Sequence, residues 1–253
     1  MAFAIRLFVL LLAAAPFSLE LKAQESCNVE AKLLLVPKQA EAAIPLLHAT
    51  GELRTRIYFY DTPSLDLLSK GLILRLREGA NGDLTVKLRP LNGKHFSGSS
   101  GRGERYKCEV EITGGVEGRS YSVGTRYRAD QVPESGVELA RLLSPGQQRL
   151  LEDFQVQVDW TKVKRVADIQ STSWTVRAQA PLNKFSMELW EWPKGEWPSG
   201  RILEVSAKTG PEAGHAAYSE LESLAKKKGL ALSAVQRSKT ATALEQMNAV
   251  PAR

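Results

Sequence analysis

Several short segments of this sequence alternate aliphatic with charged side chains at every second position. Residues 72–77 read Leu-Ile-Leu-Arg-Leu-Arg, and residues 84–89 read Leu-Thr-Val-Lys-Leu-Arg. Because successive side chains on a β-strand point to opposite sides, each segment, folded as a strand, has one aliphatic face and one polar face. This alternation predicts a sheet that is aliphatic on one side and charged on the other.

The charged face recurs along the chain. Its members are Asn28, Glu30 and Lys32; Arg75 and Arg77; Thr85, Lys87 and Arg89; Glu109 and Glu111; and Glu204, Ser206 and Lys208. Two arrangements fit this pattern. The charged side can face solvent on an ordinary half-buried sheet, or the sheet can close into a barrel whose lumen is charged. The alternation alone leaves both open.

Turn signals, propensity and periodicity predict the elements. We expect strands over residues 29–36, 54–60, 72–77, 84–89, 105–112, 154–168, 173–178, 184–192 and 201–207, and helices over 63–70, 134–143, 145–153, 211–228 and 238–247. The fold class is therefore α+β. In the barrel arrangement, the helices would cover the aliphatic outer surface.

The N-terminus resembles a secretory signal. Arg6 precedes an apolar run over residues 7–17, and Ala23 offers a small residue at a cleavage point. The run is short for a membrane-spanning helix, although an uncleaved anchor stays open as the alternative. We expect a signal peptide over 1–23 and one domain over 24–253 with a helical insert near 134–153. The mature protein would be secreted or periplasmic, without a stable membrane anchor.

The charge balance indicates an anionic partner. The formal net charge is +6 and the isoelectric point about 9.3, which favours nucleic acid, anionic lipid or phosphate compounds. Nucleic acid is not expected, because basic residues are interspersed with acidic ones instead of forming a stripe of one sign. Three histidines and two cysteines are too few for a typical zinc site.

An ordered set of short motifs resembles the CYTH family, the triphosphate tunnel metalloenzymes. The motifs run in the family's order from about Asn28 to Glu245. They are Tyr58-Phe59-Tyr60-Asp61-Thr62-Pro63, Leu74-Arg75-Leu76-Arg77, Thr85-Val86-Lys87-Leu88-Arg89, Glu109-Val110-Glu111, Leu203-Glu204-Val205 and Ser238-Lys239. The resemblance implies an antiparallel eight-stranded β-barrel, the tunnel, with helices packed outside. It also implies action on triphosphate or polyphosphate compounds with Mg²⁺ or Mn²⁺; a few members are adenylate cyclases.

The resemblance assigns roles to the charged residues. Phosphate-binding candidates are Lys32, Arg75, Arg77, Lys87, Arg89, Arg165, Lys208 and Lys239. Metal-ligand candidates are Glu30, Glu109, Glu111 and Glu204, and catalytic candidates are Glu30, Lys32 and Glu111. These residue types suit the chemistry, because guanidinium groups fork onto phosphate oxygens and hard divalent cations prefer oxygen ligands.

Two positions depart from the family pattern. Asn28 stands where the first strand usually carries a Glu, and Ser206 replaces a second Glu on the last acidic strand. Glu188 or Glu191 could supply an acidic group from another strand. The sequence therefore supports two functions: a metal-dependent phosphohydrolase, or a non-catalytic protein that binds polyphosphate or an organic phosphate.

The same alternation predicts a disulfide. If Glu30 and Glu111 point into the barrel, then Cys27 and Cys108 both point out of it. These are the two cysteines of the chain, and export would place them in an oxidising compartment. A bridge forms across the barrel wall if their strands are neighbours.

Overall fold

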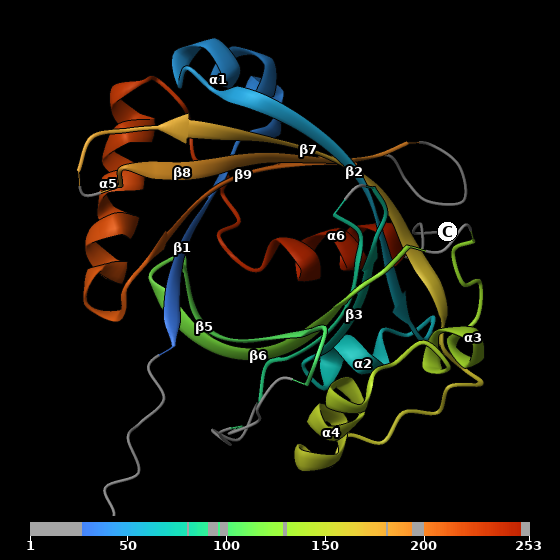
Figure 1. The fold of residues 1–253 in the computed structure, drawn as a ribbon. Coiled ribbons are helices and arrows are strands. Elements are labelled where there is room, and N and C mark those ends of the chain that lie inside the picture. The colour runs from blue at the N-terminus through green and yellow to red at the C-terminus, as the bar shows by residue number, and fades with distance from the viewer. Residues whose placement is uncertain are drawn as a thin grey trace, which may run out of the picture.

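The strands form a closed barrel (Figure 1) in the order β1-β5-β6-β4-β3-β2-β7-β8-β9. The computed structural model describes residues 27–79, 81–90, 96, 101–128, 131–180, 182–193 and 200–248; the predicted signal peptide lies outside these ranges. The strands are β1 (Asn28–Leu35), β2 (Thr50–Asp61), β3 (Leu72–Arg77), β4 (Asp83–Leu88), β5 (Glu104–Thr113), β6 (Val116–Arg126), β7 (Lys164–Arg177), β8 (Lys184–Trp192) and β9 (Gly200–Thr209).

The predicted α+β barrel is confirmed, with two differences in detail. The barrel has nine strands instead of eight, and one strand pair is parallel instead of antiparallel. β1 pairs in parallel with β5, from Asn28 opposite Glu109 to Lys32 opposite Thr113. It pairs antiparallel with β9 on its other side. β1 thus closes the barrel by lying between a strand from the middle of the chain and the last strand.

The parallel pair carries the predicted disulfide. Cys27 and Cys108 are bonded, with their Cα atoms 4.8 Å apart. Each residue directly precedes the first registered pair of β1 and β5, Asn28 and Glu109. Both cysteines are buried. The bridge therefore fixes the register of the two strands that bring Glu30 and Glu111 together.

Two strand predictions needed correction. β6 was not predicted, because its inward-facing positions include Ser122 and Gly124, which give no hydrophobic run. The predicted strands over 154–168 and 173–178 are instead one strand, β7, which starts at Lys164. Residues 154–163 form turns and an irregular connection.

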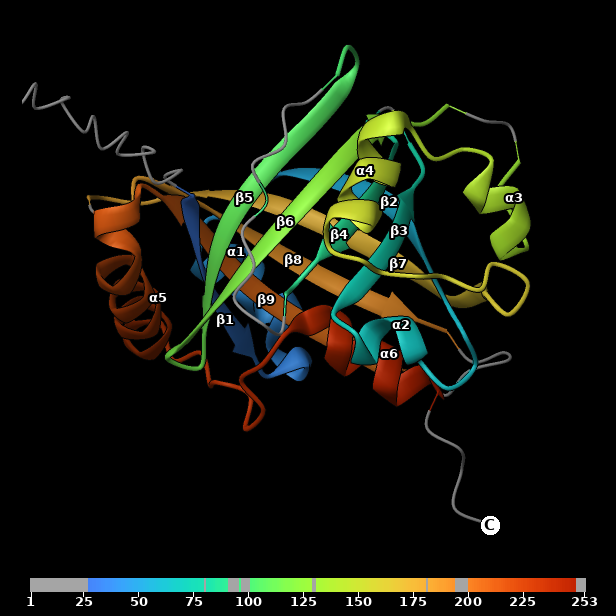
Figure 2. The same cartoon turned by 90° about the horizontal axis from the view of Figure 1, so that it is seen from below.

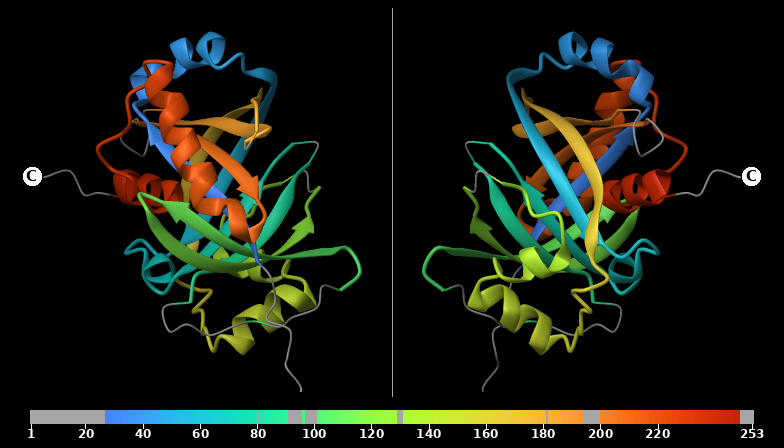
Figure 3. Two further views of the ribbon diagram at one scale, coloured as in Figure 1. Left: turned by 90° about the vertical axis from the view of Figure 1, so that its left-hand side faces the viewer. Right: turned by 90° about the vertical axis from the view of Figure 1, so that its right-hand side faces the viewer.

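Helices cover the barrel on two outer sides. The short helices are α1 (Ala40–Leu46), α2 (Asp66–Ser69) and α3 (Gly136–Ala140), with 3₁₀ turns at Pro37–Gln39 and Pro211–Ala213; the longer ones are α4 (Pro145–Asp153), α5 (Gly214–Lys227) and α6 (Lys239–Asn248). α1 and α5 pack on one aliphatic cluster that includes Leu33 and Val205. α2, α3 and α4 pack on another that includes Leu74 and Val86. Figure 3 shows these two layers on opposite sides of the strands. Within the described residues, the helices lack the length and apolar character needed to cross a membrane.

α6 does not pack on the outside as predicted. Viewed along the barrel, it lies within the ring of strands (Figure 1), and Figure 2 places it at one end, beside α2. Its buried residues Ala243, Leu244 and Met247 form an apolar cluster with inward-facing residues that include Phe59 and Ile73. The lumen is therefore apolar where α6 fills it and charged beyond.

Candidate functional site

The charged lumen forms a pocket of about 350 Å³. Strand alternation directs its side chains inward, because they occupy every second position on each strand. Among the described residues, its charged lining consists of the cations Lys32, Arg75, Arg77, Lys87, Arg89, Arg105, Lys107, Lys208 and Lys239 and the acids Glu30, Asp83, Glu109, Glu111, Glu188 and Glu204. Cations outnumber carboxylates, so the pocket carries the charge excess that an anionic ligand needs.

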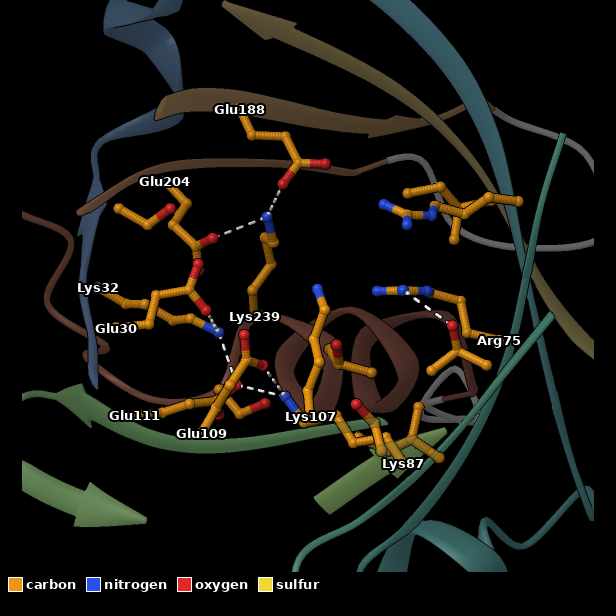
Figure 4. Close-up of a pocket in the computed structure, with 18 of the residues that line it drawn as sticks. Glu30, Lys32, Arg75, Lys87, Lys107, Glu109, Glu111, Glu188, Glu204 and Lys239 are labelled. Carbon is orange, nitrogen blue, oxygen red and sulfur yellow. Dashed lines mark hydrogen bonds and ion pairs between the residues drawn. The ribbon is translucent and has the colours of Figure 1, made fainter. Parts of the chain in front are cut away.

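Three carboxylates converge on one side of the pocket. Glu30 from β1 and Glu109 and Glu111 from β5 each offer an oxygen, and these atoms lie within 4.8 Å of one another. Figure 4 shows the three side chains pointing toward one another. Oxygen donors at such spacing suit a hard divalent cation. We refer to Glu30, Glu109 and Glu111 as the acidic group.

Glu111 also contacts three cations. Its Oε1 accepts hydrogen bonds from Lys32 Nζ at 2.7 Å and Lys87 Nζ at 2.5 Å, and its Oε2 accepts one from Arg89 Nη2 at 2.6 Å. Burial opposes ionisation of this carboxyl, but the three cations outweigh it and hold the pKa of Glu111 well below its usual range. Glu111 is therefore an ionised carboxylate held by a basic cluster.

The other acidic-group members are paired as well. Lys32 Nζ lies 3.1 Å from Glu30 Oε2, and Lys208 Nζ donates to Glu109 Oε1 at 2.9 Å. Burial disfavours charge on Lys32, but Glu111 and Glu30 outweigh it and raise the pKa of its ammonium. For Glu109 burial acts against ionisation, while Lys208 and Lys87 lower its pKa.

A second network joins α6 to the barrel. Lys239, the first residue of α6, donates to Glu188 of β8 and lies 2.8 Å from Glu204 of β9. Its ammonium lies 4.4 Å from the centre of the Trp190 ring. Glu188 also accepts hydrogen bonds from Ser171 at 2.6 Å and the Trp190 indole at 2.8 Å. Burial opposes ionisation of Glu188, but Lys239 and these bonds lower its pKa to about 2.

The wall opposite the acidic group is basic. Arg77 forms a two-pronged contact with Asp83, at 2.9 and 2.5 Å, and Arg105 Nη2 donates to the same carboxylate at 3.3 Å. Arg75 lies farther from it, at 3.8 Å. Lys107 points into the middle of the pocket (Figure 4). The pocket thus has an acidic side and a basic side, with Lys107 between them.

The structure brings most predicted site residues into this pocket. Those that line it are Glu30, Lys32, Arg75, Arg77, Lys87, Arg89, Glu109, Glu111, Glu204, Lys208 and Lys239. Ser206 also lines it, as its place on the charged face predicts. Glu204 faces Lys239 and does not belong to the acidic group of three.

Arg165 lies outside the tunnel. Its guanidinium packs 5.5 Å from the centre of the Tyr58 ring and 3.0 Å from Glu134, and Tyr58 belongs to the outer aliphatic cluster. The β2–β7 register shifts between Phe59 and Tyr60. This irregularity breaks the alternation on which an inward assignment for Arg165 depends.

Some site residues lay outside our sequence predictions. Arg105 and Lys107 precede Glu109 on β5 at the same alternation, so extending the inward pattern toward the start of the strand would have found them. Asp83 extends the pattern of β4 in the same way. Of the two open candidates on β8, Glu188 faces the pocket, whereas Glu191 contacts Arg201 at 2.9 Å and is not part of the lining.

The comparison with solved structures identifies the fold. No protein-family model matches the sequence, and the comparison with curated proteins found no match. Among solved structures, a putative adenylyl cyclase from Hippeastrum, reported to have a dominant triphosphatase activity, is 20% identical with a TM-score of 0.53, over 84% of this chain and 93% of that one. A putative adenylate cyclase from Bacillus halodurans is 12% identical with a TM-score of 0.56, over 86% and 97%.

These similarities span nearly the whole of each solved chain, and at this identity they establish the fold. They agree with the closed barrel. The chain shares the fold of these solved structures, a closed barrel of the kind that the resemblance to the CYTH family leads us to expect.

Proposed function

We propose that this protein is a metal-dependent phosphohydrolase that cleaves triphosphate or polyphosphate compounds bound in its basic tunnel. The observation that carries the proposal is the acidic group, with donor atoms within 4.8 Å of one another, beside a wall of cations in one pocket. A linear triphosphate needs both, because its closely spaced negative charges are stabilised by cations and by a metal ion that bridges phosphate oxygens.

The acidic group fits Mg²⁺ or Mn²⁺. Both ions take oxygen ligands and retain water or substrate oxygens in the remaining positions. Glu30, Glu109 and Glu111 would hold the ion, and Glu204 would remain with Lys239. When bound, the ion neutralises negative charge on the substrate.

The basic residues would bind and orient the phosphates. Arg75 and Arg77 from β3 and Arg89 directly after β4 can each direct two N–H groups at phosphate oxygens. Lys32 and Lys87 act as compact charges. Lys32 contacts both Glu30 and Glu111, so it fixes the spacing of two of the three metal-ligand candidates. Lys32, Glu30 and Glu111 therefore remain our catalytic candidates.

A second function, binding without hydrolysis, is favoured by one observation. Glu111 contacts Lys32, Lys87 and Arg89 at 2.7 Å or less, and these cations compete with a metal for its oxygens. Asn28 and Ser206 further reduce the negative charge. In this alternative the protein holds polyphosphate or an organic phosphate and releases it intact.

We also propose that the protein acts outside the cytoplasm. The predicted signal peptide supports this, and so does the Cys27–Cys108 disulfide, because disulfides persist in oxidising compartments. A fusion of residues 1–30 to a reporter that is active only after export tests the proposal. Retention of the reporter in the cytoplasm would contradict it.

One paired assay separates hydrolysis from binding. We expect phosphate release from tripolyphosphate with Mg²⁺ or Mn²⁺, and its loss in Lys87→Ala and Glu111→Ala. Binding is measured in parallel by calorimetry. Binding without release across both metals and a range of pH would favour the binding function, and the absence of both would contradict the proposal.

A further inference from the structure

Most cations of the pocket have a close carboxylate partner. Lys32, Lys87 and Arg89 contact Glu111 at 2.7 Å or less. Lys208 pairs with Glu109, Lys239 with Glu188 and Glu204, and Arg77 with Asp83. A phosphate that binds these cations must compete with the carboxylate already present.

Arg75 and Lys107 differ from this group. The nearest carboxylate contact of Arg75 is Asp83 at 3.8 Å, beyond hydrogen-bonding distance. Its Nε is shielded from solvent and has no hydrogen-bond partner within the described part of the chain. No ion pair or hydrogen bond joins the Lys107 ammonium to any other described side chain, and Lys107 is solvent-accessible in the pocket. An incoming anion can therefore bind both cations without breaking a hydrogen bond to a described carboxylate.

The side chains of Arg75 and Lys107 also face the same part of the pocket. Figure 4 shows the Arg75 guanidinium and the Lys107 ammonium directed toward each other across the middle of the pocket. Arg105 and Lys208 line the same pocket, so Lys107 and Arg75 lie among further cations and repel one another. This mutual repulsion is relieved by an anion placed between the two groups.

The wall around these cations is made of small residues. Lys107 lies opposite Ser122 in the β5–β6 register, and Arg105 lies opposite Gly124. Thr85 lies opposite both Arg75 and Gly124, and its hydroxyl accepts from Arg75 Nη2 at 3.3 Å. Glycine inside a strand often marks a place where a ligand approaches closely, and Thr85 and Ser122 add hydroxyl groups.

We propose that Arg75 and Lys107, with Thr85, Ser122 and Gly124 as the wall, form a phosphoryl subsite distinct from the cluster around Glu111. This proposal rests on the proposed function and adds Lys107 to its binding residues. A phosphoryl group occupies this subsite first, because none of the described carboxylates lies within hydrogen-bonding distance of either cation. Further phosphates of the chain then reach Lys87 and Arg89 as these exchange Glu111 for phosphate oxygens.

Metal-free binding tests the subsite. Calorimetry measures the affinity of wild-type protein for tripolyphosphate and for orthophosphate in the presence of a chelator. Lys107→Met keeps the length of the side chain and removes its charge, so we expect both affinities to fall roughly 10- to 100-fold. Lys107→Arg should restore most of the affinity. Lys226→Met, on the exposed face of α5, is the matched control and should match wild type.

A steric variant gives a second, charge-independent measurement. A Cβ at position 124 would lie 3.4 Å from Thr85 Oγ1, so Gly124→Ala narrows the subsite slightly and Gly124→Val fills it. We expect a graded loss of metal-free affinity with Lys107 intact. Thermal unfolding shows whether each variant is folded. If Gly124→Val does not fold, the test depends on Lys107→Met alone.

The result that overturns the subsite is wild-type affinity in Lys107→Met alongside weakened binding in Lys87→Ala. Phosphate release by the wild type, measured separately, would leave the proposed hydrolysis intact in that case. If the wild type releases phosphate in the presence of metal but does not bind tripolyphosphate without metal, the subsite is contradicted and the proposed hydrolysis is not. Absence of both binding and release overturns the subsite and the proposed function together.

Discussion

Glu30 and Glu111 lie directly opposite each other in the parallel register of β1 and β5. Lys32 contacts both, at 3.1 Å from Glu30 and 2.7 Å from Glu111. The acidic group is thus assembled where β1 closes the barrel, from strands that are distant in the sequence. Any change in this strand pair moves the carboxylates relative to one another.

Glu111→Gln should change metal and anion binding in opposite directions. The variant keeps the shape of the side chain but removes one of the three carboxylates of the acidic group, so we expect Mn²⁺ affinity to fall roughly tenfold or more. It also frees Lys32, Lys87 and Arg89 from an anionic partner, so metal-free affinity for tripolyphosphate should rise. Calorimetry with each ligand alone checks both signs. A parallel loss of both affinities would instead indicate a disturbed fold, which circular dichroism would reveal.

Replacing both cysteines by alanine should lower the stability of the barrel. The bridge joins residues 81 positions apart, and loss of such a constraint typically lowers the free energy of unfolding by roughly 2–5 kcal/mol. Denaturant titration measures the difference. The control is a reducing agent, which should shift the midpoint of the wild type and leave that of the double variant unchanged. An equal shift in both proteins would mean that the reductant acts elsewhere.

The Glu188–Lys239 pair predicts loss of stability in acid. The folded pKa of Glu188 is about 2, below its ordinary value of 4.5. The stabilisation is therefore complete above pH 4.5 and is lost as pH falls toward 2. Glu188→Gln should be less stable than wild type at neutral pH and should lose less stability between about pH 5 and pH 3. Unfolding midpoints across this range test it, with the exposed substitution Glu220→Gln as control. Parallel curves for wild type and Glu188→Gln would contradict the assignment.

Arg165→Ala should leave phosphate binding unchanged. Its guanidinium lies on the outer surface over Tyr58 and near Glu134, so its removal should lower stability by only about 0.5–1 kcal/mol. Arg75→Ala, inside the pocket, should weaken tripolyphosphate binding by roughly tenfold or more. Calorimetry on the two variants tests the placement. A comparable loss of affinity in Arg165→Ala would require its side chain to reach the lumen.

Side-chain alternation made most of the charged lumen predictable. Once Arg75, Lys87 and Glu111 are assigned inward, every second residue on their strands follows, which is why the predicted lining largely matches the pocket. The rule failed where the backbone is irregular. At the β2–β7 register shift beside Tyr60, strand alternation no longer predicts whether Arg165 faces the lumen or the outside.

Features that depend on distant contacts were less predictable. α6 carries apolar residues on one face. The sequence of the helix itself does not show whether that face packs on the outside of the barrel or inside it. Lys239 supplies the distinction, since it pairs with Glu188 and Glu204 on the inner wall. β6 escaped prediction because Gly124 and Ser122 are inward residues with little strand preference, although their small size gives the pocket its space.

The position of β1 has a consequence for how the chain folds. Its partners are β5 on one side and β9 on the other, so the first strand cannot complete its hydrogen bonding until the last strand has emerged. Folding must then wait for contacts between remote parts of the sequence, which is characteristic of slow folding. In the interval, one edge of β1 stays unpaired and open to association with other chains. The Cys27–Cys108 bridge can form before β9 arrives, and it would hold β1 on β5 during this vulnerable stage.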